Sequence, residues 1–134
     1  MRVCLDTNVL IAAFATRGLC ADVLRTVLAE HELVVGEVIL TELRRTLSAK
    51  FKLPADRIAA VESVLTTVPV IPKPAAPSTV PVRDSADQWI VATAVSGAAD
   101  VLVTGDRDLL AIATKSPVPI LDPRAFWELL RAGE

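Results

Sequence analysis

With 134 residues the chain suits one domain, and a domain of this size buries a core without disulfides or a structural metal. Its net charge of −2 argues against a protein that binds nucleic acid through overall positive charge. The composition, 52% hydrophobic but only 4% aromatic, favours helices packed on an apolar sheet. We therefore expect residues 1–134 to form a single domain.

The N-terminus predicts neither export nor membrane insertion. Only Arg2 precedes the first apolar run, and Asp6 and Asn8 interrupt that run well before the ~20 residues that a membrane span needs. The two cysteines, Cys4 and Cys20, are interpreted as small hydrophobic residues of a reducing compartment. With one histidine and no CxxC pair, a disulfide or zinc site is not expected. These features predict a cytoplasmic protein without membrane contact.

In chain order, the first half predicts two buried strands, each followed by two helices. The run "RVCLD" is apolar and does not alternate, as in a strand that is buried on both faces. The other elements expected in this half are helices at 7–16 and 19–31, a strand at 32–36, and helices at 37–51 and 53–68.

The second half begins with five prolines in "VPVIPKPAAPSTVPV", residues 68–82. This composition predicts a stiff, extended connection with room for a short strand at 68–71. The elements expected after it are a helix at 84–98, a strand at 100–106, a short helix or loop at 107–115, a strand at 117–121 and a helix at 122–133. Strands that alternate with helices predict an α/β fold, a three-layer α/β/α sandwich around a mostly parallel sheet.

Four acidic residues occupy unusual places in this pattern. Asp6 and Asp106 each end a predicted strand, so both should lie at the carboxyl edge of the sheet, where parallel sheets bind ligands. Asp87 falls on the apolar stripe of its helix, and Glu42 falls on the inward side of another helix. All four side chains are therefore expected to face the interior.

Carboxylates that meet in this way repel one another. At ~4 Å and an effective dielectric constant of ~20, each pair costs about 4 kcal/mol, so protonation or a cation must relieve the repulsion. With no histidine or thiolate among them, the acids suit a hard divalent ion, Mg²⁺ or Mn²⁺. The alternative is that each acid has a separate local role: Asp84 caps the helix that carries Asp87, and Asp106 is a turn residue.

Four segments, taken in order, resemble a known family. They are "LDTNVLIAA", "LTELRRTL", "RDSADQWIVATA" and "VLVTGDRDLL". Together they resemble the ordered signature of PIN domains, and the chain is especially similar to the small bacterial PIN toxins (VapC-like) of toxin–antitoxin pairs. The resemblance spans residues 2 to about 121.

The resemblance implies a ribonuclease that uses Mg²⁺ or Mn²⁺ to hydrolyse phosphodiester bonds of RNA. The family's acidic quartet is matched by Asp6, Glu42, Asp87 and Asp106. Its supporting polar positions are matched by Asn8 and Thr104, and the acids often found beside the quartet by Asp84 and Asp108. For Asp84 and Asp108, helix capping or a solvated charge is the alternative. Glu37 stands where the family commonly has small hydroxyl residues, so a shifted register with Glu37 in place of Glu42 is a further alternative. The implied partners are RNA, a cognate antitoxin and a second copy of the chain in a homodimer.

Two residue groups outside the quartet have competing interpretations. The basic residues Arg44, Arg45, Lys50, Lys52 and Arg57 form either a solvated surface or a set of phosphate contacts. The single histidine, His31, falls at the end of a predicted helix and is expected to have a capping or solvent-facing role.

Two other classes of function compete with the nuclease interpretation. A phosphoaspartyl signalling or phosphatase domain also places an aspartate after its first strand, but "DTN" lacks the second acid that such a phosphatase uses, and the adjacent acid pair of a receiver domain is missing. A catalytically inactive PIN-like module that binds nucleic acid or protein is the stronger alternative. Melting in the presence of Mn²⁺ separates the two interpretations, since only a bare acidic cluster should be stabilised by the ion.

Overall fold

The computed structural model describes residues 1–133, which form a five-stranded sheet between helices. The strands lie in the order β3-β2-β1-β4-β5, and every neighbouring pair is parallel. Their bounds are β1 Arg2–Leu5, β2 Glu32–Gly36, β3 Val70–Ile71, β4 Val101–Val103 and β5 Ile120–Leu121. The helices are α1 Thr7–Ala15, α2 Leu19–Glu30, α3 Glu37–Ala49, α4 Ala55–Leu65, α5 Ser85–Ser96, α6 Arg107–Ala111 and α7 Pro123–Ala132, with a 3-10 turn at Ala113–Lys115.

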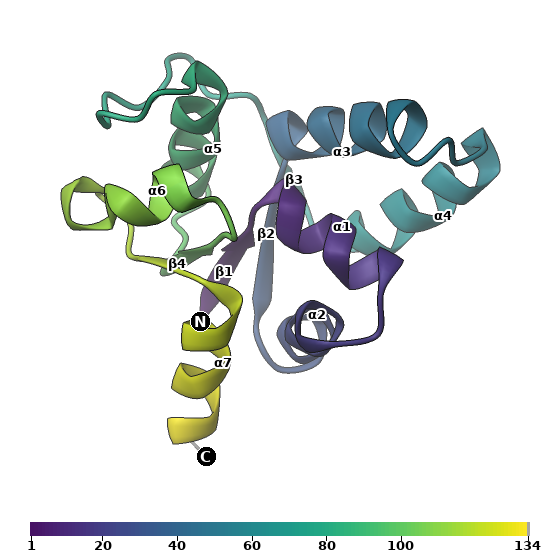
Figure 1. Ribbon diagram of the computed structural model, residues 1–134, viewed down its shortest axis with the longest axis horizontal. Helices are drawn as coiled ribbons and strands as arrows, with labels where there is room; N and C mark the ends of the chain where they lie inside the picture. Colours follow the sequence, from purple (N-terminus) through teal and green to yellow (C-terminus); the bar gives the residue numbers. More distant parts are fainter. Residues whose placement is uncertain (134) are drawn as a thin grey trace.

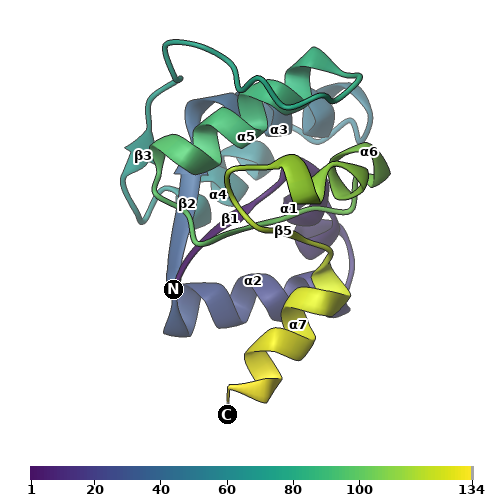
Figure 2. The same ribbon diagram turned by 90° about the vertical axis from the view of Figure 1, so that its left-hand side faces the viewer.

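The helices cover the sheet in two layers. Helices α1 to α4 lie on one side of the sheet and α5 and α6 on the other (Figure 1). Helix α7 follows the edge strand β5 and packs against α2 (Figure 2). The predicted three-layer α/β/α architecture is confirmed, and the sheet is parallel throughout rather than mostly parallel.

The central strand β1 carries the core. Val3, Cys4 and Leu5 are fully buried, because β1 pairs with β2 on one side and with β4 on the other. This explains why its sequence does not alternate between apolar and polar residues. Burial raises the pKa of the Cys4 thiol far above its usual range, so Cys4 behaves as a packed apolar side chain, as predicted.

Strand β3 is shorter than the sequence suggested. The expected strand at 68–71 is reduced to Val70 and Ile71, which pair with the end of β2. Pro69 and Pro72 lack backbone N–H groups and flank the strand on both sides, so pairing cannot extend in either direction.

Helices α1 and α2 meet at a sharp bend of 105°. Both bury apolar residues against the sheet, Val9 and Leu10 from α1 and Val23 and Val27 from α2. Within residues 1–133, no single helix is long and apolar enough to cross a membrane, and only these two helices taken together across their bend meet that test.

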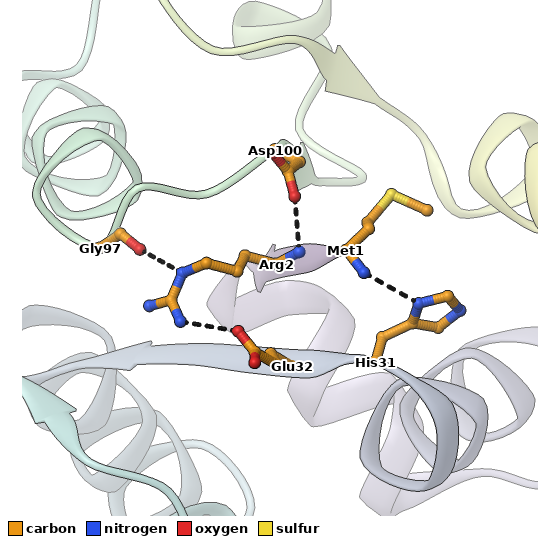
Figure 3. Close-up of polar contacts among 6 residues, drawn as sticks. All are labelled: Met1, Arg2, His31, Glu32, Gly97 and Asp100. Atoms are coloured by element: carbon orange, nitrogen blue, oxygen red, sulfur yellow. Dashed lines mark hydrogen bonds and ion pairs between the residues drawn. The ribbon is translucent and has the colours of Figure 1, made fainter.

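The amino-terminal edge of the sheet is closed by polar contacts (Figure 3). The Arg2 backbone N–H donates to Asp100 at 2.7 Å, and its guanidinium donates to Gly97 O at 2.8 Å and to Glu32 at 2.9 Å. His31 lies at this same edge, where its Nδ1 is 3.4 Å from the Met1 amino group. The predicted position of His31 at the end of a helix is thus confirmed. His31 lies at the edge of the sheet opposite to the edge that carries Asp6.

The opposite edge contains the point where the strand order reverses. Strand β1 leads through α1 and α2 to β2 on one side, whereas its other neighbour, β4, leads through α6 to β5 on the opposite side. The loops after β1 and β4 therefore diverge toward opposite faces, and the space outside such a point is where open parallel sheets bind ligands.

Candidate active site

Asp6 follows β1 directly and is only 3% exposed. One carboxylate oxygen, Oδ1, accepts a hydrogen bond from the Thr7 backbone N–H at 2.7 Å, which caps helix α1. The other, Oδ2, accepts from the Thr104 hydroxyl at 2.8 Å and from the Asn8 amide at 3.3 Å. Burial nevertheless raises the pKa of Asp6, and the Asp106 charge adds to that effect against these hydrogen bonds.

Asn8 and Thr104 join the two diverging loops. The Thr104 hydroxyl, which donates to Asp6, also accepts from the Asp106 backbone N–H at 3.0 Å. The Asn8 side-chain oxygen accepts from the Gly105 backbone N–H at 3.0 Å. Each of these side chains contacts both the loop after β1 and the loop after β4. The structure therefore places both residues where they fix Asp6 and Asp106 relative to each other.

Asp87 lies in the first turn of α5 and is 8% exposed. Its Oδ2 atom is buried and has no hydrogen-bond donor. Burial, followed by the charges of Asp106 and Asp6, raises the pKa of Asp87 to about 7. A buried carboxylate oxygen without a donor is costly in the ionised state, so this site favours either a proton or a cation beside Asp87.

Glu42 and Asp106 supply the other two carboxylates of the predicted quartet. Glu42 is half-buried on α3, and its pKa is raised first by burial and then by the Asp6 charge. Asp106 follows β4 and caps α6, accepting from the Asp108 backbone N–H at 2.8 Å. The turn role proposed for Asp106 as an alternative is therefore present, but it accompanies the approach to Asp6 and Asp87 rather than replacing it.

The four acids thus come from the end of β1, from α3, from α5 and from the loop after β4. The Asp6 charge acts on Glu42 and Asp87, and the Asp106 charge acts on Asp6 and Asp87. Among residues 1–133, however, no three acidic, histidine or cysteine side chains already converge in an arrangement that holds a metal ion. The chemistry of the donor set fits a hard divalent cation, since all donors are oxygens and one buried oxygen lacks a partner. Coordination by three of them requires side-chain rotation, for which the half-buried Glu42 has room in the adjoining cleft.

The remaining acids have distinct positions. Asp84 is exposed and caps α5, accepting from the Ala86 backbone N–H at 2.9 Å, while its charge also raises the pKa of Asp87. Asp108 pairs with Arg83 at 3.2 Å on the surface. The capping and solvated roles given as alternatives for these two residues are both observed.

Glu37, the alternative to Glu42, begins α3 and lines the same cleft as Glu42. Its carboxylate accepts from the Lys73 backbone N–H at 3.2 Å. Asp6 raises the pKa of Glu42 directly, so the structure places Glu42 as the acid of α3 that lies beside Asp6.

A cleft of about 470 Å³ opens beside Glu42. Its walls include Arg45 from α3, Lys73 from the proline-rich segment and Trp89 from α5. Sequence reasoning did not identify Lys73 or Trp89, because neither lies in a periodic pattern that links it to the acids. Trp89 follows Asp87 by two residues, which is the one sequence signal that could have indicated it.

Comparison with known proteins agrees with this geometry. A family model described as the PIN domain matches residues 2–108. A search of curated protein sequences gives no match. Among solved structures, VapBC2 from Rickettsia felis, bound to a DNA fragment from its promoter, is similar with a TM-score of 0.65, 15% identity and coverage of 91% of this chain and 98% of that one. FitAB bound to an IR36 DNA fragment has a TM-score of 0.61, 17% identity and coverage of 90% and 94%, and FitAcB from Neisseria gonorrhoeae has 0.59, 17%, 91% and 98%.

Proposed function

The chain belongs to the PIN domain family, and from this premise we propose that it is a divalent-metal-dependent endoribonuclease, the toxin of a toxin–antitoxin pair. The observation that carries the proposal is the buried Oδ2 of Asp87, which has no donor and lies beside further carboxylates at the carboxyl edge of the sheet. Ionisation of Asp87 is unfavourable in this arrangement, and a bound cation relieves that cost at a pH where the group would otherwise lose its proton.

Asp6, Glu42, Asp87 and Asp106 are the residues proposed to hold Mg²⁺ or Mn²⁺. When bound, such an ion supplies Lewis-acid stabilisation of the negative charge that builds on the phosphoryl and leaving oxygens during hydrolysis. The chain itself supplies the position. Asp6 is fixed by hydrogen bonds to both oxygens, while Asp87 keeps one oxygen free of protein donors.

Asn8 and Thr104 are proposed to act as supporting residues. Their hydrogen bonds join the loop after β1 to the loop after β4, so they set the separation of Asp6 and Asp106. Substitution of residues of this kind, which orient the metal ligands without touching the ion, typically lowers metal affinity or activity by about 10–100-fold.

The toxin role and its partners follow from the family resemblance. The similar folds of VapBC2, FitAB and FitAcB support this proposal. We propose that the protein is cytoplasmic, acts on RNA, forms a homodimer and is restrained by a cognate antitoxin. An arginine of such a partner could donate to the acids of the site, where Asp87 Oδ2 lacks a donor, because guanidinium forms strong charge-assisted hydrogen bonds with carboxylates.

The alternative function is a catalytically inactive PIN-like module that binds nucleic acid or protein. It predicts that the acids form a satisfied polar network, whereas Asp87 Oδ2 is unsatisfied. This difference favours the nuclease and also supplies the test.

Thermal melting at pH 7.5 to ~8 with increasing Mn²⁺ or Mg²⁺ is the first measurement, chosen above the pKa of Asp87 at about 7. A metal-binding site predicts that the melting temperature rises with ion concentration. At an ion concentration ~100 times the dissociation constant, the free energy of unfolding increases by about 2.7 kcal/mol. The Asp87→Asn variant is the control and should lose most of the rise.

Cleavage of a mixed-sequence RNA and of single-stranded DNA then separates the nuclease from the inactive module. The nuclease proposal expects RNA cleavage that requires added Mg²⁺ or Mn²⁺ and stops with a chelator. A protein that melts identically with and without the ions and cleaves neither substrate would be the inactive module.

A further inference from the structure

The cleft beside Glu42 has basic and aromatic walls that the acidic quartet does not explain. Glu42 lines the cleft, and Arg45 lies three residues later on the same face of α3. Lys73 and Trp89 line it as well, from the proline-rich segment and from α5. The cleft therefore joins one acid of the quartet to two cations that come from different parts of the chain.

Lys73 is held in place at both ends of the residue. Its backbone N–H donates to Glu37 at 3.2 Å, and it stands between Pro72 and Pro74, which restrict the backbone. Its Nζ lies 4.5 Å from the centroid of the Trp89 ring, within the range of a cation–π interaction. The ammonium of this exposed residue is thus positioned over Trp89 at the cleft.

Arg45 differs from its neighbour Arg44. Arg44 forms an ion pair with Glu62 of α4 and therefore faces away from the cleft. Arg45 lines the cleft, and its charge partly offsets the rise in the pKa of Glu42 that burial and Asp6 cause. Among residues 1–133, Arg45 takes part in no ion pair, so its guanidinium is available for a ligand.

We propose that Arg45 and Lys73 bind a backbone phosphate of single-stranded RNA adjacent to the phosphate that is cleaved, and that Trp89 is a positioning residue that holds Lys73. The inference rests on the proposed nuclease function and names the residues that orient its substrate. It assigns the cleft a contact with the backbone, which carries no sequence preference.

The chemistry of the cleft favours this ligand. Two cations that line one cleft suit an anion, and a position next to the acidic site suits an anion joined to the cleaved bond. Of the cleft's own acids, Glu37 already accepts from the Lys73 N–H, and Glu42 belongs to the quartet that would hold the ion. The volume of about 470 Å³ is enough to admit a phosphate group and the sugar attached to it.

The salt dependence of RNA binding tests the proposal. The probe is a short fluorescein-labelled oligouridylate, measured by fluorescence anisotropy over a range of NaCl concentrations with fixed Mn²⁺, in an Asp87→Asn background that prevents cleavage. Arg45→Gln and Lys73→Gln keep a polar side chain and part of the aliphatic stem but remove the charges. Arg44→Gln is the matched control, because it makes the same charge change one residue away on α3.

For a single strand, each phosphate contact contributes about 0.7 to the slope of log Kd against log salt. Because both side chains contact the same phosphate, the double variant should flatten the slope by ~0.7 and each single variant by no more than that, equally for oligouridylate and oligoadenylate. Arg44→Gln should leave the slope unchanged. A double variant with the slope of Arg44→Gln overturns the assignment, as does a loss that differs between the two sequences.

The role of Trp89 has a separate readout. Trp89→Leu removes the aromatic face and should weaken binding toward the level of Lys73→Gln, whereas Trp89→Phe keeps a ring and should restore it. Adding Trp89→Leu to Lys73→Gln should cause no further loss, because Trp89 acts through Lys73. An additive loss would show a direct contact of Trp89 with RNA and overturn its positioning role.

Failure of this inference differs from failure of the proposed function. If the wild-type protein cleaves RNA with Mn²⁺ but the double variant keeps its salt slope, only the phosphate contact is wrong. If the wild-type protein neither binds nor cleaves RNA, both are wrong.

Discussion

At the residue scale, the site combines satisfied and unsatisfied carboxylates. Asp6 is nearly inaccessible, yet both of its oxygens accept hydrogen bonds. Asp87 is almost as buried, but its Oδ2 has none. Asp6 is therefore a fixed acid that connects two loops, whereas Asp87 keeps one oxygen without a hydrogen-bond donor.

Substitution of the two buried acids should separate activity from folding. Asp87→Asn and Asp6→Asn keep the side-chain volume but remove a negative charge, and we expect each to lower metal-dependent cleavage by more than ~100-fold, beyond the usual effect of residues outside the ligand shell. Cleavage rates and circular dichroism spectra measure the two effects. Asp108→Asn, which loses only a surface ion pair with Arg83, should keep nearly full activity. Full cleavage by Asp87→Asn would refute the site.

The raised pKa of Asp87 predicts how stability depends on pH without metal. Between the ordinary value of 3.8 and about 7, the folded protein holds a proton that the unfolded chain has released. The folded state then binds more protons, so stability falls as pH rises through this window and levels off above it. Asp87→Asn should flatten the fall and melt at a higher temperature than wild type at pH 8 to ~9. Melting curves recorded from pH 4 upward test this, and parallel profiles for the two proteins would contradict it.

Residue patterns predicted the acids but not their cationic neighbours. Asp87 and Glu42 are recognisable because each puts a charge on an otherwise apolar helix face, and Asp6 and Asp106 because each ends a strand. Lys73 lies in an irregular segment, and its contacts with Glu37 and Trp89 depend on tertiary packing. The same holds for Arg44 and Arg45, which the sequence grouped together and the structure separates.

At the element scale, the position of Glu42 depends on how closely β2 approaches α5. Gly36 ends β2 and precedes α3, and a Cβ atom added there would lie 2.3 Å from Cγ2 of Thr93. Thr93 is fully buried, and its hydroxyl donates to Trp89 O at 2.9 Å, so its methyl group has little freedom to move. The absence of a side chain at residue 36 thus lets α3 begin at the level of the acids.

Gly36→Ala should therefore strain the junction of β2, α3 and α5. We expect it to lower the free energy of unfolding by about 1–3 kcal/mol, as overpacking of a core does, and to reduce cleavage because α3 carries Glu42. Thr93→Ser removes Cγ2 and keeps the hydroxyl, so Gly36→Ala combined with Thr93→Ser should recover much of the loss. Urea unfolding of the four proteins measures the coupling. Additive losses would mean that the two side chains do not clash.

The order of the elements followed from the sequence, and their lengths followed less well. Strands β1, β2 and β4 are continuous apolar runs that end in polar residues, so their existence and parallel pairing were predictable. Strand β3 was predicted too long because Pro69 and Pro72 limit its ladder on both sides. The neighbours of a strand also depend on the path of the whole chain, which no local pattern specifies.

At the scale of the whole molecule, the two edges of the sheet have opposite character. At the amino-terminal edge, the Arg2 guanidinium pairs with Glu32 and the Arg2 backbone N–H donates to Asp100, so opposite charges meet and the strands are tied together. At the carboxyl edge, like charges gather and the pKa values of Asp6, Glu42 and Asp87 are all raised. Stability is thus supplied at one edge while the other holds an arrangement that favours a cation.

The proposed toxin role can be tested in cells. A nuclease whose site lies open at the edge of the sheet needs restraint from another chain, so expression of the protein alone in a bacterial host should slow growth within a few generations. Co-expression of a cognate antitoxin should restore growth, because a partner that covers the acids and donates hydrogen bonds to them from a cation neutralises their charge and excludes RNA. Asp6→Asn should be harmless at equal expression, since its fold persists while a proposed ion ligand is lost. Growth curves with protein levels measured by immunoblotting provide the readout. If an intact protein that cleaves RNA in vitro leaves growth unaffected, the toxin role is wrong and the nuclease assignment stands.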